Sequence, residues 1–151
     1  MLLTELLTPE RIKIPLEARS KEELLRELVN VVSGTDPEDH DEVLRAVRER
    51  EAVLSTGIGH GVAIPHGKSA AVGELRMAAG RMRAPVDFDA LDGQPVSLVF
   101  LLVGPESAAG PHIKALSRIS RIVRRDDVRE RLIAARDADE FLQVLGEAEA
   151  T

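Results

Sequence analysis

One histidine stands out in the sequence because its neighbours restrict where its side chain can lie. His66 lies between Pro65 and Gly67, and it follows three apolar residues and three alternate glycines that begin at Gly57. Proline fixes its own φ and favours extended geometry before it, whereas glycine allows a sharp turn after it. We expect a short strand that ends abruptly and holds the imidazole at its C-terminal edge, where α/β folds place ligands. An imidazole there can act as a nucleophile or a metal ligand. A polar residue in a tight turn is the alternative.

Two nucleotide-binding patterns and a metal site compete for the same stretch. Gly67-Lys68-Ser69 matches the end of a P-loop, but that motif needs glycine where this chain has Val62. The dinucleotide fingerprint fails at the same position. The histidines show no HExxH spacing and the chain has no cysteine, so no metal is expected. The four histidines are His40, His60, His66 and His112, and a domain in which three of them converge on a metal stays open as an alternative.

Composition bounds the class of protein. We expect one domain, residues 1–151, with an aliphatic core, because 44% of the residues are hydrophobic and only 2% are aromatic. The net charge of -6 argues against a broad nucleic-acid-binding surface. The lack of cysteine fits a reducing compartment, and no segment resembles a signal peptide or a membrane span. A cytoplasmic protein without direct membrane insertion is the expectation.

Strand and helix patterns predict an α/β sandwich with a mixed central sheet flanked by helices. The apolar run 96–103 is typical of a strand buried on both faces. Ser20 and Glu23 form a capping-box pattern before an apolar stripe at helical spacing. The other expected elements are an edge strand at 12–16, the end of the first helix at Gly34, a helix from Asp36 to about Glu51, a strand at 75–82, a turn at 92–93, helices from about His112 to Arg124, from Asp126 or Asp127 to Ala134 and from Asp137 to about Leu145, and frayed last residues.

The stretch around His66 resembles the phosphorylation-site signature of a known family. Glu51, six further residues and then Ile58-Gly59-His60-Gly61-Val62-Ala63-Ile64-Pro65-His66-Gly67 are similar to that of EIIA domains of the fructose/mannitol class. These domains belong to the bacterial phosphoenolpyruvate-dependent sugar phosphotransferase system and include a nitrogen-regulatory branch. The segments 48–51 and 86–96 and the helix at His112 resemble family segments in the same order. His60 departs from the family, in which Asn or Asp is common.

The resemblance implies a function and a set of site residues. His66 would accept a phosphoryl group from phospho-HPr and pass it to a EIIB domain during sugar uptake. By motif position, Arg50 matches the family's active-site arginine and His112 a second active-site histidine. A nitrogen-regulatory EIIA, whose phosphorylation state controls partner proteins, is the alternative function.

The chemistry expected of these side chains agrees with that role. Phosphoryl transfer spreads negative charge over the equatorial oxygens, which a guanidinium such as Arg50 can bind with two donors. His112 is expected at a helix start, where free amides favour an anion, and the amides of Gly59, Gly61 and Gly67 are further candidates for phosphate binding. A solvated arginine and an ordinary first-turn histidine are the alternatives. No cofactor is required. The basic residues from Lys114 to Arg131 form a solvated face or a docking surface for an acidic partner.

Overall fold

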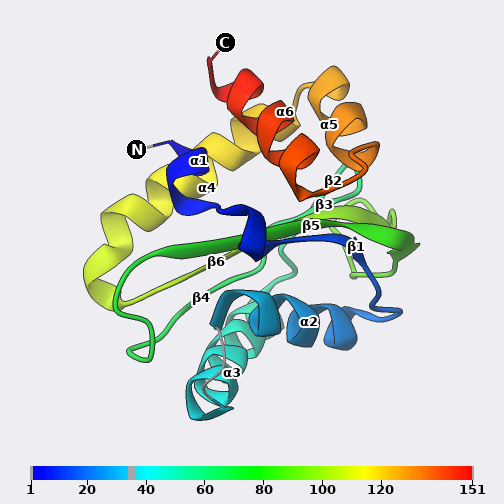
Figure 1. Ribbon diagram of the computed structural model, residues 1–151. Coiled ribbons are helices and arrows are strands. Elements are labelled where there is room, and N and C mark those ends of the chain that lie inside the picture. Colours follow the sequence, from blue (N-terminus) through cyan, green and yellow to red (C-terminus); the bar gives the residue numbers. More distant parts are fainter. Residues whose placement is uncertain (1, 34–36, 151) are drawn as a thin grey trace.

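The centre of the fold is a six-stranded mixed sheet (Figure 1), seen in a computed structural model that describes residues 2–33 and 37–150. The strands are β1 (Ile12–Leu16), β2 (Gly57–Gly59), β3 (Val62–Ala63), β4 (His66–Lys68), β5 (Arg76–Val86) and β6 (Val96–Gly104). Their order is β1-β5-β6-β3-β2, and β4 also pairs with β6. The pairs β1·β5, β3·β6 and β4·β6 are parallel, whereas β5·β6 and β2·β3 are antiparallel. The predicted edge strand is confirmed as β1.

Helices cover both faces of the sheet, which confirms the predicted α/β sandwich. The helices are α1 (Leu3–Leu6), α2 (Lys21–Ser33), α3 (Pro37–Val53), α4 (Ala109–Val123), α5 (Asp126–Ile133) and α6 (Ala138–Ala150), with 3-10 turns η1 (Pro9–Arg11) and η2 (Glu106–Ala108). Figure 1 shows α2 and α3 on one face and α1, α4, α5 and α6 on the other. Within residues 2–33 and 37–150, no helix has the length and apolar character needed to cross a membrane. The predicted helix end at Gly34 and start at Asp36 lie outside these residues.

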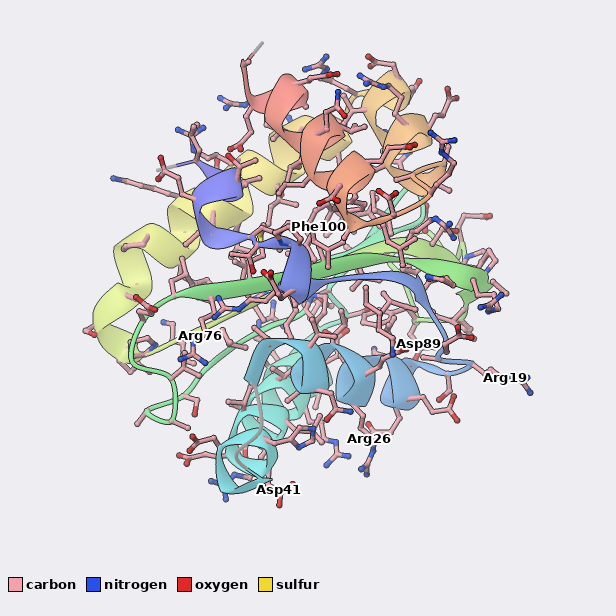
Figure 2. All side chains as sticks on the ribbon, viewed as in Figure 1. Arg19, Arg26, Asp41, Arg76, Asp89 and Phe100 are labelled. Atoms are coloured by element: carbon pink, nitrogen blue, oxygen red, sulfur yellow. The ribbon has the colours of Figure 1, made fainter. Side chains whose placement is uncertain are left out.

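Strand β6 lies at the centre of the sandwich, because its side chains alternate between the hydrophobic clusters on the two faces of the sheet. Leu98, Phe100 and Leu102 pack with α4, α5 and α6, while the intervening residues 99, 101 and 103 pack with α2 and α3. Figure 2 shows Phe100 on the side of the sheet where α5 and α6 lie, and its ring centroid is 6.0 Å from that of Phe141. Burying each such side chain contributes about 1.5–3 kcal/mol. The apolar run at 96–103, broken only by Ser97, therefore has the physical cause that the sequence indicated.

Ser20 and Asp137 cap their helices, but the last helix is longer than expected. Ser20 Oγ accepts a hydrogen bond from the Glu23 amide at 3.1 Å, and Asp137 Oδ1 accepts one from the Glu140 amide at 2.8 Å. The prediction that the last helix ends near residue 145 and then frays is wrong, since α6 continues to Ala150. Its last turn is held because the Glu149 carboxylate accepts the amides of residues 3 and 4 at 2.6 and 3.0 Å.

Two other helix starts differ from the prediction. α4 begins at Ala109 rather than His112, because Pro111 lies in the first turn, where its missing amide would have had no partner. His112 therefore lies one turn inside the helix. Arg125 occupies the N-cap position of α5, and the two aspartates expected to cap this helix lie in its first turn instead.

Candidate functional site

His66 begins a strand, so the prediction of a strand that ends at this residue is wrong. β3 stops at Ala63, and β4 starts at His66, which pairs with Leu102 of β6. Pro65 interrupts the ladder because it has no amide hydrogen. Its carbonyl oxygen accepts a hydrogen bond from the Leu102 amide at 3.1 Å. This bond holds the chain beside β6, so that His66 lies in the sheet.

The prediction that the chain turns away sharply at Gly67 is wrong, because Gly67 continues in β4. The positive φ angles of this stretch lie at Gly59, His60 and Gly61 instead. A Cβ on Gly67 would lie 3.0 Å from the backbone nitrogen of Val47 in α3. The glycine therefore favours a close approach between β4 and α3, the helix that carries Arg50.

The imidazole of His66 is held in one tautomer. Its Nδ1 lies 2.9 Å from the carbonyl oxygen of Ile64. A carbonyl only accepts hydrogen bonds, so Nδ1 carries the proton and Nε2 keeps its lone pair. This arrangement makes Nε2 the nucleophilic atom of the ring.

His112 lies against His66 and is buried. The two ring centroids are 5.4 Å apart with an interplanar angle of 69°, and 5% of His112 is exposed. Burial, followed by the charges of His66 and Lys68, lowers the pKa of His112 to about 4. This imidazole is therefore neutral at physiological pH. Its Nε2 is buried without a hydrogen-bond partner among the described residues.

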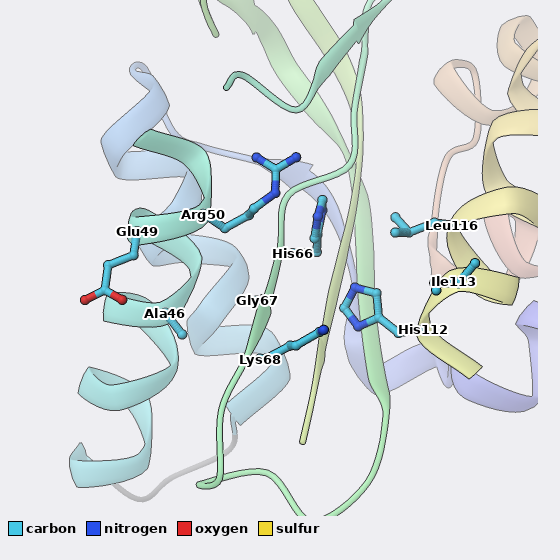
Figure 3. A pocket seen from close by; sticks show the side chains of 9 residues that line it. All are labelled: Ala46, Glu49, Arg50, His66, Gly67, Lys68, His112, Ile113 and Leu116. Carbon is cyan, nitrogen blue, oxygen red and sulfur yellow. The ribbon is translucent and has the colours of Figure 1, made fainter. Parts of the chain in front are cut away.

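Arg50 and both histidines line one cavity of about 540 Å³ between α3, β4 and α4 (Figure 3). Arg50 lies in the last turn of α3, and its Nη1 donates to the carbonyl oxygen of Leu54 at 2.9 Å. The three predicted catalytic side chains thus come together from segments far apart in the sequence. The lining residues are Ala46, Glu49, Arg50, His66, Gly67, Lys68, His112, Ile113 and Leu116.

Burial and neighbouring cations keep His66 neutral. Desolvation is the largest cause that lowers its pKa, and the hydrogen bond to Ile64 partly opposes it. The charges of Arg50 and Lys68 lower the pKa further, while that of Glu51 raises it.

Lys68 was not recognised as a site residue from the sequence, because it was considered only as part of a failed P-loop match. Its spacing of two from His66 on a strand could have identified it.

A buried carboxylate connects the end of α3 to the residues that hold His66. Glu51 is only 7% exposed. Its carboxylate accepts hydrogen bonds from the Thr56 amide at 2.8 Å and the Thr56 hydroxyl at 2.6 Å, and it forms an ion pair with Lys21 at 3.0 Å. The carbonyl oxygen of Thr56 then accepts the amide of Ile64 at 3.0 Å. The sequence marked Glu51 only as a motif position, and Lys21 was missed because it lies 30 residues away, on α2.

Gly59 and Gly61 lie away from the cavity, at the turn between β2 and β3. The Gly61 carbonyl accepts the amides of residues 97 and 98, whereas His66 pairs with residue 102. Four residues of strand correspond to about 13 Å. Of the three predicted phosphate-binding glycines, the structure brings only Gly67 to the cavity. His60, at φ 56°, occupies a left-handed position that suits Asn or Asp, and its amide donates to Asp92 at 3.0 Å.

The histidines do not converge on a metal. In the part of the chain that the structure describes, no group of three or more His, Asp, Glu or Cys side chains could hold a metal ion. The metal-binding alternative therefore has no candidate site there.

Six of the seven basic residues from Lys114 to Arg131 fall into two groups. Arg125, Arg129 and Arg131 form ion pairs with acidic residues of α5 and α6. Lys114, Arg118 and Arg121 line a groove of about 460 Å³ on α4. Docking of an acidic partner on this second group stays a prediction.

Comparison with known proteins gives the family. A family described as "Phosphoenolpyruvate-dependent sugar phosphotransferase system, EIIA 2" matches residues 5–148. The chain therefore belongs to this EIIA family, as the stretch around His66 indicated.

Individual relatives and structures agree with this assignment. The chain is similar to a nitrogen regulatory protein of Bradyrhizobium diazoefficiens, with 40% identity over 100% of this chain and 99% of that protein. It is 38% identical to the fructose-specific EIIABC component of Bacillus subtilis over 97% of this chain, although it spans only 23% of that protein. The crystal structure of IIA-Ntr from Neisseria meningitidis superposes with a TM-score of 0.86 and 38% identity, covering 95% of this chain and 98% of that chain.

Replacing Glu51 tests whether the buried carboxylate anchors the site. In Glu51→Gln one acceptor oxygen becomes a donor, so a hydrogen bond from Thr56 is lost and the Lys21 ammonium loses its counter-charge. We expect the free energy of unfolding, measured in urea, to fall by about 1–3 kcal/mol. Glu42→Gln, on an exposed part of the same helix, should change it by less than about 0.5 kcal/mol. Equal effects of the two substitutions would contradict the anchoring role.

The lowered pKa of His112 predicts a pH dependence of stability. Between its ordinary pKa of 6.5 and the folded value of about 4, His112 is protonated in the unfolded chain but neutral in the folded one. In this range the unfolded state binds one more proton than the folded state. The contribution of His112 to the free energy of unfolding is therefore fully present above pH 6.5 and is lost as the pH is lowered through this range. From about pH 7.5 to about pH 4.5, the wild type should lose about 2–3 kcal/mol more than His112→Gln. Urea unfolding at both pH values measures this difference, and parallel losses would refute it.

Proposed function

We propose that this chain is a phosphohistidine carrier, a phosphotransferase that accepts a phosphoryl group from phospho-HPr on Nε2 of His66. The observation that carries the proposal is the 2.9 Å hydrogen bond from Nδ1 to the Ile64 carbonyl, which leaves Nε2 unprotonated. The lowered pKa of His66 supports a neutral nucleophile at physiological pH. Membership of the EIIA family supports HPr, or an HPr-like phosphocarrier, as the donor.

In the proposed transfer, the Nε2 lone pair forms a new N–P bond as the N–P bond of phospho-HPr breaks. The bonding electron pair returns to the donor imidazole. His66 keeps its Nδ1 proton, and the Ile64 carbonyl stabilises the positive charge that the ring acquires. Arg50 binds the equatorial oxygens of the transferring group. We assign the partnerless Nε2 of His112 a hydrogen bond to one of these oxygens. The step includes no metal and no cofactor.

Two roles are proposed for the phosphorylated protein. In the first it passes the phosphoryl group to a EIIB domain during sugar uptake, and a solved complex of the mannitol enzyme IIA of Escherichia coli contains phosphorylated enzyme IIB as its partner. In the second its phosphorylation state regulates a partner protein. Nearly full-length likeness to nitrogen regulatory proteins, at 40% identity in Bradyrhizobium diazoefficiens and 38% in Pseudomonas aeruginosa, favours the regulatory role. Transfer of label to a purified EIIB domain separates the two.

Labelling tests the acceptor atom. Phosphoenolpyruvate, Enzyme I and HPr should label the wild type on His66, and NMR of the ¹⁵N-labelled ring should identify Nε2 as the phosphorylated nitrogen. His66→Ala should carry no label. Label that persists in this variant, for example on His112, would overturn the proposal.

Substitution of Arg50 tests the oxygen-binding role. Loss of a two-donor guanidinium should slow transfer from phospho-HPr by about 10- to 100-fold, since charge-assisted hydrogen bonds contribute about 1.5–3 kcal/mol. Arg50→Lys should recover only part of the rate because it keeps the charge but loses the planar fork. Quench-flow measurement of single turnovers gives the rates, and the melting temperature checks the fold. A rate of Arg50→Ala within two-fold of wild type would exclude this role.

A further inference from the structure

Lys68 is a cation inside the cavity to which the transfer described above gives no role. It ends β4, two residues after His66, so both side chains lie on the same side of the strand. Figure 3 shows its side chain extending into the cavity toward His112. Its charge acts on both rings, because it contributes to the lowered pKa of His66 and of His112.

The partner of Lys68 in this structure is weakly bound. The ammonium lies 3.8 Å from the carboxylate of Glu106 in η2, and the two side chains are 47% and 85% exposed. An ion pair this long and this exposed contributes between 0 and about 1 kcal/mol, so it exchanges easily for a stronger anion. A phosphoryl group on Nε2 of His66 would carry about two negative charges in the same cavity and would be such an anion.

We infer that Lys68 is a catalytic ligand of the phosphoryl group on His66, and that it leaves Glu106 when His66 becomes phosphorylated. The inference rests on the proposed function and adds to it a second cation, on the α4 side of the cavity. Arg50 approaches from α3 and Lys68 from β4, so the oxygens of the group are bound from two sides. Phosphorylation also releases the Glu106 carboxylate just before α4, three residues before that helix begins at Ala109. A partner protein can therefore distinguish the two states of His66 by the charge around η2.

Equilibrium measurements test this ligand without dependence on docking rates. The phosphorylated protein is mixed with unphosphorylated HPr, and the distribution of label gives the equilibrium constant. Lys68→Ala should shift it toward HPr by about five-fold, as expected for a charge-assisted bond in a partly exposed site. Lys68→Arg should restore most of this shift. Glu106→Gln, which removes the competing anion, should move the equilibrium slightly the other way. Lys13→Ala, which removes an exposed lysine of β1 outside the cavity, is the matched control and should leave it unchanged.

A second readout responds to the ligand but not to a merely structural lysine. The pKa of the phosphoryl group, followed by ³¹P NMR, should rise in Lys68→Ala because a nearby ammonium stabilises the dianion. Wild-type label on His66, with Lys68→Ala matching Lys13→Ala in both measurements, would overturn the inference alone. Absence of label on wild-type His66 would overturn the proposed function, and the inference with it.

Discussion

A single buried carboxylate fixes the geometry of the site. Moving an ionised carboxyl group out of water costs several kcal/mol unless donors replace the solvent. Glu51 is satisfied by the amide and hydroxyl of Thr56 and by a lysine ammonium from α2. Because Thr56 accepts the amide of Ile64, and the carbonyl of Ile64 holds the ring of His66, the position of the carboxylate determines that of the imidazole. Arg50 precedes Glu51 on α3, so the imidazole of His66 and the guanidinium of Arg50 share one anchor.

The topology then brings a third side chain to this anchor from the opposite face of the sheet. β4 lies between α3 and α4, paired with β6, and successive residues of a strand face opposite sides. Gly67 therefore faces α3, where a Cβ would crowd the backbone of Val47, while His66 on the other side meets His112 of α4. The missing side chain of Gly67 thus allows α3 to approach one side of β4, and His66 places its imidazole against α4 on the other side.

Much of the fold could be predicted from the sequence, because its signals are local. The apolar run of β6 and the caps at Ser20 and Asp137 act through neighbouring residues. His66 was identified for the same reason, whereas Arg50 and His112 were reached only through the family signature, since 62 residues separate them. The misjudged role of Gly67 has a related cause. Its small size matters for packing against a distant helix, which local backbone preferences do not reveal.

The charges around the cavity suit the proposed function, in which a phosphoryl group is passed on as well as received. Burial keeps both imidazoles neutral, so a phosphoryl dianion would meet the cations Arg50 and Lys68 without a third positive charge from His112. Neither cation is buried, and ion pairs at partly exposed positions are weak because water competes for them. Donor and acceptor phosphohistidines are similar in energy, so a carrier that bound the group in a dry, multiply charged pocket would retain it. A carrier of this kind therefore needs Arg50 and Lys68 to stay accessible to water as much as it needs the free lone pair of His66.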